Sequence, residues 1–257
     1  MTVGSFCLIK NEIPWIAAHL ESWLPYLDQM VFFDGNSTDG TLGILRHASK
    51  ASTKVTLVEN MDPKDLTDDY VRIFNACLHS LDTDYALFIH PDMLLDHPGD
   101  IRSLGGYIAY TTSLRSFAGE PGGQLYEIKS GRGELWKNIY RLRSPNLGLH
   151  YFGHYGAINE DCYFSKITGN QHEFYGQDIS RYPYEIKDSG IKILHFSDVR
   201  SRERRLDRMV KCLHNQGHAE DRILEIAQNH PRVTLKDGAG FKFEPAEYPE
   251  MLRIANA

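Results

Sequence analysis

The stretch Met30–Leu45, MVFFDGNSTDGTLGIL, decides the fold. Val31–Phe33 has the continuous apolar character of a buried strand, and Leu42–Leu45 opens a helix. One polar residue is enough to cap that helix. The turn before it holds five polar side chains, Asp34, Asn36, Ser37, Thr38 and Asp39. The surplus predicts a polar pocket at the carboxyl end of a strand, where open α/β sheets bind ligands.

Strands and helices alternate through the first hundred residues. Apolar runs predict strands at 3–9, 30–33 and 55–58, and a fourth in YALFIHPDM, residues 85–93. Helical spacing predicts helices that begin near residues 13, 41 and 66. Strands separated by helices are typical of parallel crossovers, so we expect an α/β fold with a mostly parallel sheet and helices on both faces.

The second half has a different pattern. QLYEIK (124–129) and LWKNIYRLR (135–143) alternate as strands between turn sequences, and IKILHF (191–196) predicts a last buried strand. We expect loops, with room for short strands, at 144–190, and amphipathic helices around 206–213 and 223–227. An irregular tail is expected from residue 229. Because no repeat or linker is evident, we expect a single domain over 1–257, with an irregular second half.

Composition limits the class of protein. The net charge of −6 argues against general binding to nucleic acid. The scattered cysteines include no C-x-x-C pair, which is typical of reduced thiols in a cytoplasmic protein: Cys7, Cys77, Cys162 and Cys212. The first residues lack the pattern of a signal peptide, and no apolar run approaches the roughly 20 residues of a membrane span.

Polar corners follow three of the predicted strands: KNE at Lys10–Glu12, the stretch from Asp34 to Asp39, and HPD at His90–Asp92. In a parallel sheet, these corners lie at one edge, so residues far apart in sequence can converge there. A carboxylate joined by a histidine suits a divalent cation bound through oxygen and nitrogen.

The order of these corners resembles the glycosyltransferase family 2 enzymes, which have the GT-A fold. Their KNE-like turn is matched by Lys10–Glu12, and their strand ending D-x-x-S-T-D-G-T by Asp34–Thr41. A later helical pair is matched by Arg72 and Asn75 in YVRIFNACL, and the D-x-D strand by ALFIHPDMLL. The subset that adds sugars to bacterial lipopolysaccharide core also has a strand ending near a histidine and then a basic helix, as in ILHFSDVRSRERRLDRM. The resemblance is good over 3–96 and partial over 136–210.

The resemblance implies transfer of a sugar from a nucleotide-sugar donor, first of all a UDP-sugar, to an acceptor hydroxyl. Residues 1–100 would bind the donor and residues 101–228 the acceptor. Mn²⁺ or Mg²⁺ would stabilise the departing diphosphate as a Lewis acid. The implied metal ligands are Asp92, His195 and, in place of the first acidic residue of D-x-D, His90. The implied donor-binding residues are Lys10, Asn11, Glu12, Asp34, Asn36, Asp39, Arg72, Asn75, His90 and Arg202.

An inverting transfer also needs a general base near the acceptor hydroxyl. INEDCYF holds Asp161, the first candidate, and Glu160, the second, in the region where relatives have an acidic motif. A retaining mechanism would need neither, and the sequence does not decide the stereochemistry.

Structural interpretations compete with these roles. Asp39 can serve the helix dipole, Pro91 can simply set a turn, and His195 can be a buried core residue. The arginine-rich run 200–208 suits diphosphate binding or a solvated helix face. Gly35 replaces a second aspartate of many relatives, which leaves the nucleotide base open.

Other functions also fit the sequence. A saccharide is the first choice of acceptor, and a hydroxymethylated base in phage DNA is the second. A nucleotidyltransferase or an inactive nucleotide-sugar-binding module would use a similar pocket. The sequence does not fix the oligomeric state.

Overall fold

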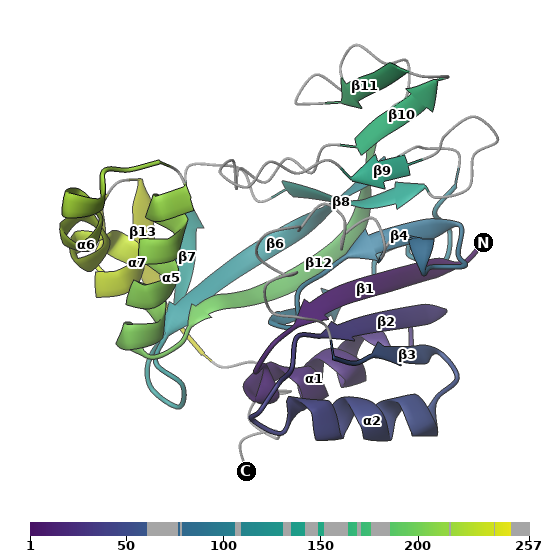
Figure 1. Ribbon diagram of the computed structural model, residues 1–257, viewed down its shortest axis with the longest axis horizontal. Helices are drawn as coiled ribbons and strands as arrows, with labels where there is room; N and C mark the ends of the chain where they lie inside the picture. The colour runs from purple at the N-terminus through teal and green to yellow at the C-terminus, as the bar shows by residue number, and fades with distance from the viewer. Residues whose placement is uncertain are drawn as a thin grey trace. The chain divides into compact units, whose positions relative to one another are not determined.

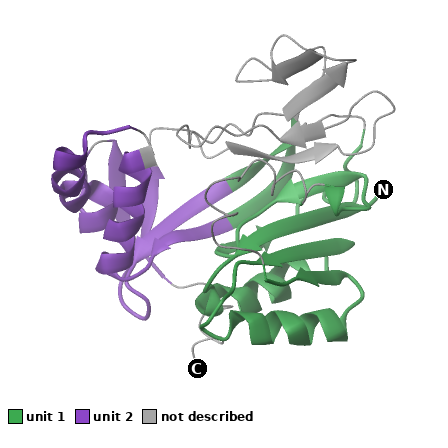
Figure 2. Ribbon diagram, viewed as in Figure 1, with its two compact units in different colours: residues 1–113, 135–153, 160–193 green, residues 114–134, 154–159, 194–257 purple. Residues whose placement is uncertain are grey.

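The computed structural model describes most of the chain, and between 135 and 175 it describes the backbone alone. The described residues are 1–60, 77, 79–105, 109–130, 135–141, 149–151, 164–168, 171–175, 186–215, 217–238 and 240–247. The chain forms two compact units (Figure 2). Unit 1 comprises residues 1–113, 135–153 and 160–193, and unit 2 comprises 114–134, 154–159 and 194–257. The single-domain organisation stays a prediction.

Unit 1 contains the predicted parallel sheet. Its strands, in the order β4–β1–β2–β3, are β4 (Tyr85–Phe88), β1 (Val3–Ile9), β2 (Gln29–Asp34) and β3 (Val55–Val58). All three pairings are parallel, and they align Ile9 with Asp34 and Phe6 with Phe88. Helices α1 (Ile13–Trp23) and α2 (Thr41–Ala51) make the first two crossovers. The predicted α/β class is therefore confirmed.

The apolar pattern explains these elements. Strand β1 is almost entirely buried, as expected for a parallel strand covered on both faces. Helix α1 begins with Pro14 in its first turn and buries one face, including Ile16 and Trp23. Helices α1 and α2 contact each other and run side by side along β1–β3, so they cover the same face (Figure 1). The third predicted helix, near 66–81, lies largely outside the described residues, so helices on both faces stay a prediction.

Antiparallel strands extend the sheet of unit 1. Strand β8 (Leu135–Arg141) pairs with β4, and β6 (Ala109–Gly119) pairs with β8. Strand β12 (Ile186–Val199) pairs with β5 (Met93–His97) and β6, and it begins five residues before the predicted 191–196. Strands β9 (Leu149–Tyr151), β10 (Phe164–Thr168) and β11 (Gln171–Tyr175) form a separate antiparallel sheet in the predicted loop region.

Unit 2 combines an antiparallel sheet with helices. Strand β7 (Leu125–Ser130) pairs with the end of β6 and with β13 (Phe241–Ala246). Helices α5 (Arg202–Asn215) and α6 (Glu220–Asn229) enclose a small apolar cluster around Leu213, Ile223 and Ala227. No described helix of either unit is both long and apolar enough to cross a membrane.

The prediction of an irregular tail from residue 229 is wrong for 231–234 and 241–246. These residues form α7 (Pro231–Thr234) and β13. The His230 ring accepts a hydrogen bond from the amide of Arg232 at 3.2 Å and so caps α7. Strand β13 gains its hydrogen bonds from β7, a partner more than a hundred residues away, so the local sequence carries a weak signal for it.

Candidate functional site

The three predicted polar corners lie at one edge of the parallel sheet. Strand β1 lies between β2 and β4, and all three run in the same direction. The register places Asp34 beside Ile9, just before the KNE corner, and Phe88 beside Phe6, just before the HPD corner. Neighbouring strands lie about 5 Å apart, so β2 and β4 are about 10 Å apart across the sheet. The structure thus brings these corners together within unit 1.

Hydrogen bonds lock the first two corners to each other. The amide of Asn11 donates to Ser37 Oγ at 2.9 Å, and the amide of Thr38 donates to Asn11 Oδ1 at 2.8 Å. The amide of Glu12 donates to Thr41 Oγ1 at 2.9 Å. Asn11 has a φ of 58°, a left-handed conformation that asparagine tolerates better than most residues. Much of the polar surplus in this stretch therefore holds two loops in a fixed arrangement.

Asp39 caps two helices with one carboxylate. Its Oδ2 accepts from the first amide of α1, that of Ile13, at 3.1 Å. Its Oδ1 accepts from the first amide of α2, that of Thr41, at 3.1 Å and from Thr41 Oγ1 at 2.6 Å. Partial burial acts to raise the pKa of Asp39, but these hydrogen bonds outweigh it and hold the pKa below its ordinary value. The structural role considered for Asp39 is thus present, and its contact with a donor stays a prediction.

Asp34 has a different environment. Its side chain is fully buried, and Oδ2 accepts from the amide of Ser37 at 3.0 Å. Its other oxygen, Oδ1, is buried and has no hydrogen-bond partner among the described residues. A buried carboxylate oxygen without a partner is costly, so such atoms commonly mark a place where a ligand or water donates. Lys10 and Asn36 are exposed near Asp34, and their donor contacts stay predictions.

The HPD corner forms a tight turn after β4. The amide of Met93 donates to the carbonyl of His90 at 3.0 Å, which closes the turn. The ring of His90 is half-buried and packs edge-on against Phe88, with 4.7 Å between ring centres. Pro91 sets the turn, as the structural interpretation expected, and Asp92 is 5% exposed. The structural and functional interpretations of this corner are compatible.

Two buried titratable side chains lie beside this corner, and sequence reasoning gave neither a role. His19 of α1 and Cys7 of β1 are buried, with 3.6 Å between His19 Nε2 and Cys7 Sγ. Burial lowers the pKa of His19 to about 4, so the ring is neutral at neutral pH. Burial, and then the negative charge of Asp92, raise the pKa of the Cys7 thiol. The signal in the sequence was a histidine on the apolar face of α1.

The described part of the chain contains no group of three or more His, Cys, Asp or Glu side chains able to hold a metal ion. Asp92 belongs to unit 1 and His195 to unit 2, so their joint role as ligands stays a prediction. Magnesium is commonly held by one or two carboxylates together with substrate phosphates, which needs no such cluster. The nearly buried carboxylate of Asp92 suits that arrangement.

The arginine-rich run of α5 is partly structural. Arg205 is only 4% exposed and donates to the carbonyls of Gly119, at 2.7 Å, and Arg200. It also forms an ion pair with Glu120 at 2.8 Å. The interpretation of this run as a solvated helix face is therefore wrong for Arg205. Arg202 is exposed in the first turn of α5, and its contact with a diphosphate stays a prediction.

Four of the predicted site residues lie outside the described residues: Arg72, Asn75, Glu160 and Asp161. Their roles stay predictions.

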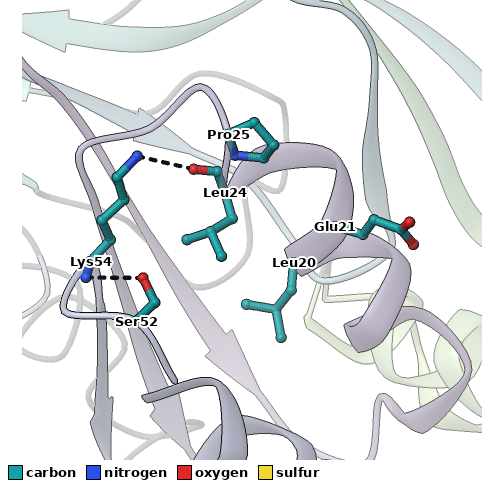
Figure 3. Close-up of a pocket in the computed structure, with 6 residues that line it drawn as sticks. All are labelled: Leu20, Glu21, Leu24, Pro25, Ser52 and Lys54. Carbon is teal, nitrogen blue, oxygen red and sulfur yellow. Dashed lines mark hydrogen bonds between the residues drawn. The ribbon is translucent and has the colours of Figure 1, made fainter. Parts of the chain in front are cut away.

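A hollow of about 390 Å³ lies elsewhere in unit 1 (Figure 3). Its apolar lining comes from Leu20, Leu24 and Pro25, at the end of α1. Lys54 Nζ donates to the carbonyl of Leu24 at 3.3 Å and so caps that helix. The hollow borders residues that precede β2 and β3, whereas the polar corners follow the strands. It is therefore separate from the candidate site.

Comparisons with solved structures identify the fold. The mannosyltransferase PcManGT from Pyrobaculum calidifontis, solved in complex with GDP-Man and Mn²⁺, is 14% identical, with a TM-score of 0.50 over 93% of this chain and 76% of that chain. S. aureus TarS 1-349 in complex with UDP is 14% identical, with a TM-score of 0.41 over the same shares.

A further TarS structure is 19% identical, with a TM-score of 0.34 over 48% of this chain and 22% of that chain. This chain thus spans about a fifth of that TarS chain. No family model matches the sequence, and a search of curated proteins finds no match. The likeness to the mannosyltransferase shows the GT-A-like α/β fold that the sequence predicted.

Proposed function

We propose that this chain is a glycosyltransferase that binds a nucleotide-sugar donor at the carboxyl ends of β1, β2 and β4. The observation that carries the proposal is Asp34 Oδ1, a buried acceptor without a protein partner among the described residues, at the end of β2. The fold supports the proposal, because the mannosyltransferase with a similar fold was solved with GDP-Man and Mn²⁺.

Asp34 would recognise the nucleoside of the donor. Its Oδ2 is held by the amide of Ser37, which fixes the carboxylate and leaves Oδ1 as an acceptor. A ribose hydroxyl or a base N–H would satisfy Oδ1 with a charge-assisted hydrogen bond. The loops at 11–13 and 37–41, which hydrogen bonds lock together, would hold Asp34 Oδ1 in place before the nucleotide sugar arrives. This lowers the entropic cost of binding.

Asp92 would hold a divalent cation, Mn²⁺ or Mg²⁺, together with the donor diphosphate. The cation would act as a Lewis acid on the diphosphate as it departs. At about 4 Å and an effective dielectric constant near 20, a pair of unit charges interacts by about 4 kcal/mol. His90 stands two residues from Asp92, and it and His195 are proposed as additional ligands.

The acceptor side rests on sequence alone. We propose a saccharide acceptor, a UDP-sugar as the first donor to test, and Asp161, then Glu160, as the general base. The net charge of −6 places DNA second.

A thermal-shift screen tests the donor site. UDP- and GDP-sugars are added to the full chain with and without Mn²⁺. Ligand at a hundred times its dissociation constant stabilises the folded state by about 2.7 kcal/mol. We expect one donor class to raise the melting temperature, more strongly with Mn²⁺. Asp92→Ala should abolish the increment from Mn²⁺, whereas Asp96→Asn, at an exposed carboxylate of β5, should preserve it.

Product analysis separates the competing activities. A glycosyltransferase releases a nucleoside diphosphate from a nucleotide sugar, a nucleotidyltransferase releases inorganic diphosphate from a nucleoside triphosphate, and a binding module releases neither. If Asp92→Ala kept the wild-type response to Mn²⁺ and donor, the proposed cation site would be wrong. Retention on duplex DNA at moderate salt would favour the DNA acceptor.

A further inference from the structure

Buried hydrogen-bond donors on side chains of β1 and α1 hold the HPD turn at both of its ends. The thiol of Cys7 donates to the carbonyl of Ile89, the residue before the turn, at 2.9 Å. His19 Nδ1 and Trp23 Nε1 both donate to the carbonyl of Met93, the residue after Asp92, at 2.9 Å each. His19 and Trp23 show no exposed surface, and Cys7 is 1% exposed.

The bonding of His19 defines its chemical form. A carbonyl oxygen can only accept, so Nδ1 carries the proton and donates to Met93. The lone pair of Nε2 then faces Cys7 Sγ at 3.6 Å. The imidazole and the thiol are thus in contact, and no hydrogen bond joins them because the single thiol hydrogen is donated to Ile89. A polar ring is costly on a buried helix face, and here its hydrogen bond to Met93 offsets part of that cost.

The positions of the two carbonyls explain why these buried side chains matter for the site. Ile89 lies directly before His90 and Met93 directly after Asp92, so hydrogen bonds to their carbonyls fix the path of the turn that carries His90 and Asp92. The position of the Asp92 Cα follows the carbonyl of Met93, which His19 and Trp23 hold. Small displacements matter, because cation ligands must converge on a single point.

We propose that His19 is a positioning residue for Asp92. Assisted by Trp23, it holds the carbonyl of Met93 so that the carboxylate meets a divalent cation. This inference rests on the proposed function, in which Asp92 binds that cation. A core histidine without this role would affect the stability of the fold and leave cation affinity unchanged.

Substitutions that retain or remove the Nδ1 donor separate these two roles. His19→Asn keeps an N–H donor close to the position of Nδ1, whereas His19→Leu keeps similar bulk without any donor. Leu27→Ala is the control for lost packing, because Leu27 is fully buried and precedes β2, at the opposite edge of the sheet.

The assay measures Mn²⁺ binding rather than turnover. The full chain is titrated with Mn²⁺ in the presence of UDP and, in parallel, GDP, and the paramagnetic resonance signal reports free Mn²⁺. We expect His19→Leu to weaken Mn²⁺ binding about tenfold, in the range found for outer-shell partners of metal ligands. His19→Asn should bind close to the wild-type value. Nucleotide binding without Mn²⁺ should be unchanged, and Leu27→Ala should lose stability without losing Mn²⁺ affinity.

The contrary outcomes are distinct. If the wild-type chain binds neither nucleotide nor Mn²⁺, the proposed function fails and the inference fails with it. If the wild type binds both but His19→Leu matches it, or His19→Asn is as weak as His19→Leu, only the inference is overturned. If His19→Leu does not fold, His19→Gln is the second variant, because its amide lies near the position of Nε2, which removes the Nδ1 donor while a polar group remains. Unchanged Mn²⁺ affinity in that variant would equally overturn the inference.

Discussion

Removal of the Asp39 carboxylate should loosen two helices at once. In Asp39→Ala, the amide of Ile13 at the start of α1 and the amide of Thr41 at the start of α2 both lose their acceptor. The residues at the N-cap positions, Glu12 and Gly40, make no side-chain hydrogen bond that caps these helices. Asp39 therefore caps both helices, although it occupies the N-cap position of neither.

The expected loss follows from the number of caps. Replacement of a capping side chain by alanine costs about 1 kcal/mol, so two caps amount to about 2 kcal/mol. Asp39→Asn keeps one oxygen and places an amide N–H₂ opposite the other backbone donor. The loss of unfolding free energy in Asp39→Asn should therefore be about half of that in Asp39→Ala.

The pH dependence has a defined sign. The pKa of Asp39 is lowered in the folded state, so the folded protein favours the charged carboxylate. Its contribution to stability is then complete above the unfolded pKa, about 3.9, and is lost as the pH falls through the lower folded pKa. The difference between wild type and Asp39→Ala should thus be constant near neutral pH and shrink below about pH 4.

Urea unfolding and amide hydrogen exchange measure these effects. The midpoint in urea should fall without a change in slope. The amides of Ile13 and Thr41 should each exchange about fivefold faster, as about 1 kcal/mol for each lost cap implies. Asp96→Ala, at an exposed carboxylate that takes no part in these hydrogen bonds, should change neither value. Unchanged protection of both amides in Asp39→Ala would refute the double cap.

Three further substitutions test other parts of the structure. Asp34→Asn places an N–H₂ where a hydroxyl or N–H group of the ligand would arrive, so the affinity for the nucleotide sugar should fall about tenfold in calorimetry. The unfolding free energy should change by less than about 1 kcal/mol. An unchanged affinity would remove Asp34 from the site. The hydrogen bond from Arg115 holds the pKa of Glu127 at about 2, below its ordinary 4.5. The advantage of wild type over Glu127→Gln, about 1 kcal/mol for a partly exposed pair, should therefore hold above about pH 4.5 and vanish toward pH 2 in acid unfolding; a difference that persisted at pH 2 would contradict this. In Gly99→Ala, a Cβ would lie 2.4 Å from the backbone of Gly190, at a φ of +49°, so denaturant unfolding should show a loss of at least about 2 kcal/mol, and a wild-type midpoint would exclude that contact.

Local patterns in the sequence were sufficient for the parallel half of the fold. The apolar run of Val31–Phe33 and the helical spacing after Thr41 gave β2 and α2 within a residue or two. Their order along the chain then placed the corners at one edge, because parallel crossovers leave strand ends on the same side. Each of these features depends on neighbours in sequence.

Other features depend on partners far along the chain. Strand β13 exists through its pairing with β7, and the segment of β6 has no clear alternation. Arg205 stands in a charged helix yet is buried, because the carbonyl of Gly119 and the carboxylate of Glu120, both far along the chain, accept hydrogen bonds from its guanidinium. The polar surplus after β2 was visible in the sequence. Its division into groups that lock the loops and one buried hydrogen-bond acceptor, Asp34, depends on the folded arrangement of two loops.

A crystal structure of the full chain with UDP and Mn²⁺ tests the donor site most directly. We expect anomalous density for Mn²⁺ within bonding distance of the Asp92 carboxylate, and a hydroxyl or N–H group of the nucleoside about 2.8 Å from Asp34 Oδ1. A nucleotide bound elsewhere, for instance in the hollow beside Leu24 and Lys54, with neither aspartate in contact, would contradict it.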